Sequence, residues 1–117
     1  MNPSKIESEA EIASLKLKLE ASIRSKILVT EAIKTLEVLS ARDSSDRGSI
    51  NASVARLTSV IAGDDSAIET IKARMSRAME RAARPGIADH VARLTAEIEA
   101  SAKRDVATAG KRPRGGP

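Results

Sequence analysis

The hydrophobic positions between residues 54 and 82 repeat every seven residues. Apolar side chains fill nearly every first and fourth place of this repeat, with one polar exception at Asp64; they are Val54, Leu57, Ile61, Ile68, Ile71, Met75, Ala78 and Ala82. Alternating steps of three and four keep these side chains on one side of an α-helix, where another helix must cover them. The pattern predicts one helix over residues 50–83, with Gly63 as a tolerated weak point.

A first long helix is predicted over residues 4–41. Its main apolar stripe has the same spacing and includes Ile12, Leu15, Leu19, Val29, Ile33 and Leu36. Several large side chains of this helix fall outside that stripe, namely Leu17, Leu28, Val38 and Leu39. A helix that is apolar on more than one side is usually the middle of a bundle or part of an oligomer interface. This helix therefore argues against an isolated monomeric hairpin.

Two breaks separate the predicted helices. Residues 42–49 hold turn formers and no large hydrophobe, which predicts a short loop between two antiparallel helices. Arg84-Pro85-Gly86 is the stronger break, because proline and glycine together do not belong in a helix interior. A third helix is predicted over residues 87–108, with an apolar face that fades after Ile98. Residues 110–117 contain no hydrophobe, so they are predicted to be a disordered basic tail.

The predicted fold class is all-α: an antiparallel helical hairpin or coiled coil with a third, shorter helix in domain 1–109, followed by the tail at 110–117. We assign ten residues to the helix-pairing seam: Leu15, Leu19, Ile33, Leu36, Val54, Leu57, Ile61, Ile68, Ile71 and Met75. The 117 residues include no Phe, Tyr or Trp. The core must therefore be thin and aliphatic, which suits facing helices, and self-association would cover more of it.

One residue within the second apolar stripe carries a charge. Asp64 occupies a seam position, and Lys26 occupies the equivalent kind of position in the first helix. If the hairpin turns at about residues 45–46, antiparallel pairing sets Lys26 opposite residue 65, where it can meet Asp64 or Asp65. A buried carboxylate is costly unless it is paired, and polar residues at seam positions can fix register. We hypothesise that such a pair forms here.

The net charge of +4 lies entirely in the C-terminal two thirds of the chain. Four arginines at steps of three, four and three share one helix face, and the tail adds further basic residues; this candidate polyanion-binding set is Arg74, Arg77, Arg81, Arg84, Lys111, Arg112 and Arg114. Such a row can follow phosphate groups. The alternative is a solvated flank whose arginines pair with glutamates of the first helix. Without aromatic side chains, sequence-specific reading of single strands is disfavoured.

Catalytic chemistry finds little support in the chain. There is no cysteine, and the single histidine, His90, points away from its neighbour Asp89 on a helix. The serines have no base partner or Gly-x-Ser-x-Gly elbow, and the carboxylates lie on exposed rods. We assign no catalytic, cofactor-binding or metal-binding residue, and expect no enzyme activity. With no visible signal peptide and no stretch of 18 apolar residues, we expect a cytoplasmic protein without membrane contact.

The function favoured by the sequence is a non-enzymatic helical interaction module: a scaffold, adaptor or chaperone-like protein acting through coiled-coil contacts. Its partner would be a second copy in a homo-oligomer, or another helical protein. The alternative is a basic nucleic-acid-binding accessory protein of a mobile element, such as a plasmid or phage. In that alternative the arginine row and the C-terminal tail contact the DNA backbone.

Overall fold

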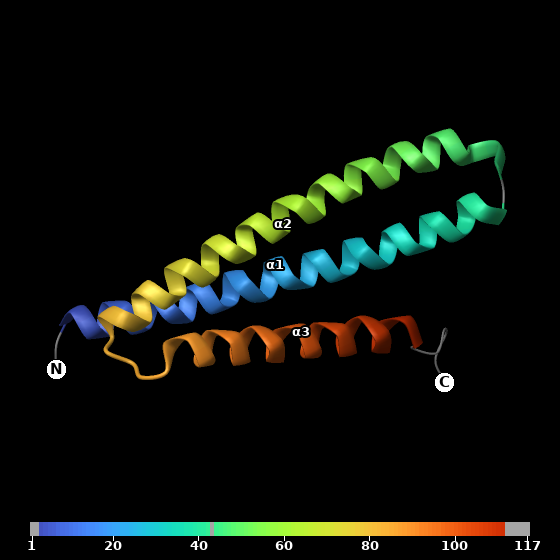
Figure 1. Ribbon diagram of the computed structural model, residues 1–117. Coiled ribbons are helices and arrows are strands. Elements are labelled where there is room, and N and C mark those ends of the chain that lie inside the picture. The colour runs from blue at the N-terminus through green and yellow to red at the C-terminus, as the bar shows by residue number, and fades with distance from the viewer. Residues whose placement is uncertain (1–2, 43, 112–117) are drawn as a thin grey trace.

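The computed structural model describes residues 3–42 and 44–111 of the chain. In that part of the chain the elements are α1 (Pro3–Arg42), the short 3-10 helix η1 (Ser44–Asp46), α2 (Arg47–Arg81) and α3 (Ile87–Lys111). α1 and α2 form a long antiparallel hairpin, and α3 turns back to run beside α1 in the same direction (Figure 1). The predicted all-α hairpin with a third, shorter helix is confirmed.

The boundaries of the two long helices lie close to the predicted ones. α1 is one residue longer at each end; Pro3 fits its first turn, because the N–H that proline lacks has no partner there. α2 begins three residues before the predicted start, so residues 47–49 are helical and the predicted loop was too long. The first turn of a helix tolerates a glycine and a serine, since its N–H groups need no partner within the helix. α2 passes through Gly63 without a break, as predicted.

α2 ends in a tight backbone turn. The N–H of Ala83 donates to the carbonyl of Glu80, and the N–H of Arg84 donates to the carbonyl of Met79, both at 3.0 Å. This pair of bonds is the Schellman pattern, which satisfies carbonyl groups left without partners at a helix end. It places Ala83 in the left-handed region at φ 57°, where glycine is the usual residue. The turn is therefore built with some strain at Ala83.

α3 begins where predicted and ends at Lys111, three residues later than predicted. Its apolar face does not fade after Ile98, because Ala102 is buried and Val106 is half-buried. These two residues continue the stripe that we expected to end in polar positions. The first residues of the predicted tail therefore belong to α3, and residues 112–117 lie outside the described part of the chain.

The core lies only where all three helices overlap. It contains aliphatic side chains from every helix: Ile12, Leu15, Leu19, Ile23, Met75, Ala78, Met79, Ala82, Val91, Ile98 and Ala102. Among the described residues between 24 and 74, none is buried. At its near end this stretch still meets α3, where Arg24 pairs with Asp105, but the distal half of the hairpin extends beyond α3 (Figure 1). Two helices alone cover only one side of each other, so the distal half has a seam but no enclosed core.

Two reciprocal substitutions test this backbone description. Gly63→Ala should raise the free energy of unfolding by about 0.5–1 kcal/mol, because this glycine is helical and a Cβ there would meet open space. Ala83→Gly should also raise it, by about 1 kcal/mol, because a Cβ is strained at positive φ. Chemical denaturation followed by circular dichroism, at one fixed chain concentration, measures both.

Gly86→Ala is the matched control for these two variants. A Cβ at Gly86 also meets open space, but its φ of 57° makes alanine strained, so this variant should lose about 1–2 kcal/mol. If Gly63→Ala destabilised the protein as much as Gly86→Ala, the continuous course of α2 through residue 63 would be wrong.

Candidate interaction surfaces

All ten residues of the predicted seam have reduced exposure. Three of them are buried (Leu15, Leu19 and Met75), and seven are half-buried (Ile33, Leu36, Val54, Leu57, Ile61, Ile68 and Ile71). The buried members lie under α3, and most of the half-buried ones lie in the distal half of the hairpin. Because α1 and α2 pack closely along their length, this seam is used within the chain. The seam itself therefore leaves little exposed apolar surface for a partner.

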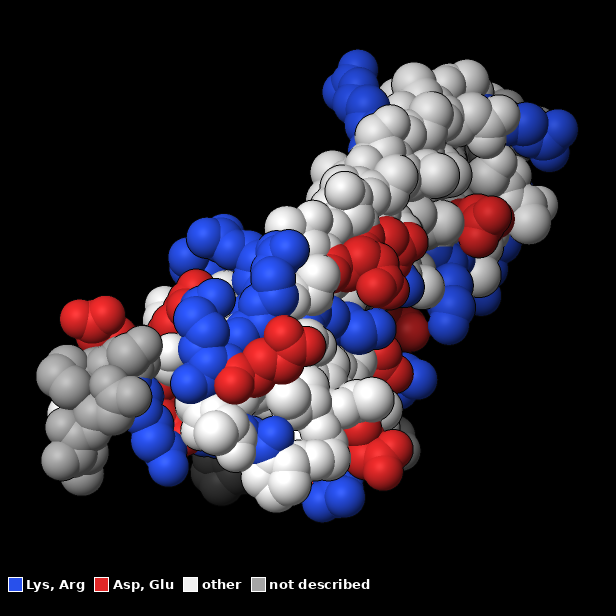
Figure 2. Space-filling view, turned by 60° about the vertical axis from the view of Figure 1, so that its left-hand side comes forward, with Lys and Arg blue, Asp and Glu red and all other residues white. Residues whose placement is uncertain are grey.

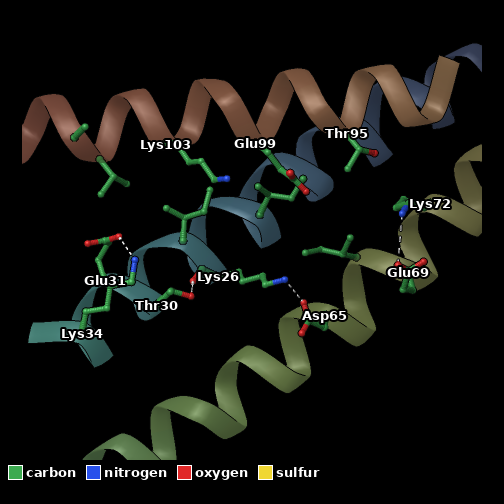
Figure 3. Close-up of a pocket in the computed structure, with 15 residues that line it drawn as sticks. Lys26, Thr30, Glu31, Lys34, Asp65, Glu69, Lys72, Thr95, Glu99 and Lys103 are labelled. Atoms are coloured by element: carbon green, nitrogen blue, oxygen red, sulfur yellow. Dashed lines mark hydrogen bonds and ion pairs between the residues drawn. The ribbon is translucent and has the colours of Figure 1, made fainter. Parts of the chain in front are cut away.

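Two polar contacts hold α1 and α2 in register near the middle of the hairpin. The Nζ atom of Lys26 lies 2.6 Å from Oδ1 of Asp65 (Figure 3). The Ser25 hydroxyl donates to Oδ2 of Asp64 at 2.8 Å. The hypothesis that Lys26 meets one of these aspartates is correct, and Asp65 is the one that it contacts. Asp64, the polar member of the seam, is half-buried and satisfied by Ser25. A one-residue slip would break both contacts.

The charge of Lys26 is stabilised by this arrangement. Its hydrogen bond to Asp65 raises the pKa of the ammonium group, partial burial opposes the rise, and the negative charges of Asp65, Glu99 and Asp64 add to it. A raised pKa in the folded state stabilises the fold below the ordinary value of 10.5, and this contribution is lost as the pH rises through the folded pKa. On the lysine side, the contact therefore weakens at strongly alkaline pH, where the ammonium group loses its proton.

The arginine row splits into two pairs with different surroundings. Arg81 pairs with Glu11 of α1, and Arg84 pairs with Glu9, the Nε of Arg84 donating to Oε1 at 3.2 Å. Arg74 and Arg77 are exposed, and neither makes an ion pair within the described residues. Half of the row thus joins the end of α2, and the turn after it, to the start of α1. These two arginines match the alternative of a flank paired with glutamates.

Whether the basic tail lies near the arginine row is not seen in the described residues. Lys111 is the last residue of α3, and Arg112 and Arg114 lie outside the described residues. The clustering of tail and arginine row therefore stays a prediction from the sequence. On the face shown in Figure 2, Lys and Arg are interleaved with Asp and Glu over the three-helix end of the molecule, and a broader uncharged area lies toward the distal end of the hairpin.

α1 carries a second apolar stripe, on the side away from α2. We call it the outer stripe; its ten positions, all exposed, are Ile6, Ala10, Ala13, Leu17, Ala21, Arg24, Leu28, Ala32, Thr35 and Leu39. Its four large side chains recur every eleven residues and are exposed by 46–67%. Eleven residues make three turns plus about 20°, so the stripe stays on one face of the helix. About 140° of helical rotation separates it from the seam.

This stripe was not predicted as a unit. Leu17, Leu28 and Leu39 were expected outside the seam, but their common spacing with Ile6 was not predicted. The signal was available, because steps of four, three and four run through the whole set from Ile6 to Leu39. The heptad pattern of the same helix masked it, since both patterns use steps of three and four.

A groove of about 920 Å³ lies between the three helices, where α3 diverges from α1. Ile23, Ile27, Ile68 and Val106 supply apolar surface to it, and four lysines and four carboxylates line it as well (Figure 3). Three of these lysines are paired with acidic residues of the same groove: Lys26 with Asp65, Lys34 with Glu31 and Lys72 with Glu69. The charges are balanced, so the groove has no preference for an anion or a cation.

We next consider the residue types that bind metals. Within the described residues, no three His, Cys, Asp or Glu side chains lie together in a way that could hold a metal ion. His90 is half-buried near the start of α3, where its backbone N–H donates to the carbonyl of Gly86 at 2.9 Å. None of the helices in the described part of the chain combines the length and apolar character that crossing a bilayer requires.

Comparison with known proteins finds no matching family model, no matching curated protein and no matching solved structure. We therefore infer the function from the surfaces of the molecule itself.

A double-mutant cycle tests the register contact. Lys26→Met combined with Asp65→Asn should show a coupling energy of about 0.2–1 kcal/mol, the range of solvent-exposed ion pairs. The same cycle with Asp64→Asn should give a clearly smaller coupling, because Asp64 bonds to Ser25 instead. Equal coupling to both aspartates, measured by chemical denaturation, would contradict the pairing described above.

A carboxyl titration tests the pairing at the end of the arginine row. The hydrogen bond from Arg84 lowers the pKa of Glu9 below its ordinary value of 4.5. This lowered pKa stabilises the fold above pH 4.5, and the contribution disappears as the pH falls through the folded pKa. Arg84→Gln should return the pKa of Glu9 toward 4.5, as followed by carbon NMR, whereas Arg81→Gln should leave it nearly unchanged.

Proposed function

We propose that the protein is a non-enzymatic helical interaction module that acts through helix–helix contacts as an oligomer. The observation that carries this proposal is the outer stripe. Leu17 is 67% exposed, and Ile6, Leu28 and Leu39 are close to half exposed on the same face. Scattered surface hydrophobes are normal, but a continuous row of them along a helix marks an interaction site.

The composition of the outer stripe favours a helix as the partner. Its large side chains are separated by small ones, four of the ten positions being alanine. Small residues between leucines let a second helix approach closely, with its ridges between the leucines. Only one of the ten positions, Arg24, is charged. A scaffold, adaptor or chaperone-like role would use this face in the same way.

Nucleic-acid binding is the competing proposal, and the ion pairs of the arginine row weaken its support. Arg81 and Arg84 would have to exchange their carboxylate partners for phosphates, which leaves Arg74 and Arg77 as the readily available contacts. Two phosphate contacts give little affinity at physiological salt. Duplex binding that is steeply weakened by salt and lost in Arg74→Ala/Arg77→Ala would favour this competitor.

Light scattering with refractive-index detection tests the interaction proposal, since the chain has no Trp or Tyr for absorbance at 280 nm. We expect a mass above that of one chain, falling to one chain in Leu17→Glu/Leu28→Glu because a carboxylate at each position prevents desolvation of the stripe. Circular dichroism should stay helical, as both positions are exposed.

Val60→Glu is the control, because Val60 is an exposed aliphatic residue of α2 outside the outer stripe. This variant should keep the mass of the unaltered protein. A single-chain mass for the unaltered protein over the whole accessible concentration range would overturn the proposed oligomer. An oligomer unaffected by the double substitution would show that another surface is used.

A further inference from the structure

We propose that the occupant of the outer stripe is a second copy of this chain, with its α1 antiparallel to the first and related to it by a two-fold axis. This inference rests on the proposed function and specifies its partner and geometry. The axis passes beside α1 between residues 22 and 23. In this arrangement, the numbers of any two outer-stripe residues that face each other add up to 45.

The spacing of the outer stripe is symmetric about this axis. Steps of four, three and four read the same in both directions, so every position of one stripe lies opposite a position of the other. Leu17 faces Leu28 of the second copy, Ile6 faces Leu39, and Ala13 faces Ala32. Large residues therefore meet large ones at four levels, while alanines between them permit close approach. A two-fold interface requires this kind of self-complementarity.

The charges near the centre favour the antiparallel orientation. Arg24 lies opposite Ala21 of the second copy and next to its Glu20, on the same side of the interface. Glu20 makes no ion pair within the described residues, and Arg24 already donates to Asp105 of α3 at 2.9 Å with only part of its five-donor guanidinium. The two-fold axis generates two Arg24–Glu20 contacts between chains. A parallel pair in register would place the two Arg24 side chains against each other instead.

The eleven-residue repeat also explains how the contact extends along the helix. A repeat of 11 corresponds to 3.67 residues per turn, so two such helices stay in contact with only a slight supercoil. From Ile6 to Leu39 the stripe covers about 50 Å of helix axis. All ten positions are exposed beside α2 and α3.

Single cysteines test the geometry against a background with no native cysteine. Leu17→Cys mixed with Leu28→Cys should form a covalent dimer under mild oxidation, because these positions face each other. Each variant alone should give at least tenfold less, since its two cysteines would lie about 16 Å apart along the axis, too far for a disulfide. Non-reducing gel electrophoresis measures the yield, and light scattering confirms that each reduced variant keeps its mass.

The outcomes separate this inference from the proposed function. Efficient cross-linking of Leu17→Cys alone would show a parallel pair and overturn the antiparallel geometry. A non-covalent oligomer with no cross-link in the mixture would overturn the inference while leaving an interaction module that uses another arrangement. A monomer before oxidation would overturn both. Glu20→Gln should weaken the oligomer, because it removes the carboxylate that Arg24 of the second copy contacts, and an oligomer of unchanged strength would show that this contact is absent.

Discussion

An aliphatic core needs three helices to close it, and this requirement governs how the molecule is built. Without aromatic side chains, no single residue is large enough to cover a gap between two rods. Leu19, Ile23, Met75 and Met79 are enclosed only because α3 lies over the proximal half of the hairpin. Beyond α3, the same kind of aliphatic residue at Ile33 or Val54 is only half-buried. An aliphatic side chain of the hairpin is therefore buried where α3 covers it, however regular the heptad pattern is.

The polar contacts act within this frame by selecting one alignment of the helices. Aliphatic ridges alone tolerate shifted registers, because leucine and isoleucine pack acceptably in many combinations. The contacts of Lys26 and Ser25 with neighbouring aspartates fix the register near the middle of the hairpin. The ion pairs of Arg81 and Arg84 act at the C-terminal end of α2 and in the turn that follows it. Each contact contributes little free energy, since all lie near solvent. Their main effect is to fix how the helices are aligned along one another.

The main features of the fold could be predicted because they depend on local patterns. Helix periodicity, the break at Pro85 and Gly86, and the opposition of Lys26 to residue 65 all follow from spacing along the chain. The end of α3 was misjudged because small or distant residues, Ala102 and Val106, continue its apolar face, and alanine is a weak signal of burial. The left-handed Ala83 was also beyond prediction, since the usual indicator is glycine.

The surfaces were harder to predict than the fold. Whether an arginine lies free or paired depends on which glutamate of α1 is brought opposite, and only the three-dimensional alignment shows that Arg84 meets Glu9. The leucines outside the seam were visible, but their number suggested a broad apolar helix rather than a second ordered row. Exposure of all ten outer-stripe positions separates the two possibilities.

α1 thus carries two repeats, one of seven residues toward its own chain and one of eleven residues away from it. No residue belongs to both rows, so a substitution in one row leaves the side chains of the other row in place. The face proposed for assembly and the residues that hold the fold are therefore separate sets within one helix. Natural selection could strengthen, weaken or redirect the contacts between molecules without first having to rebuild the molecule.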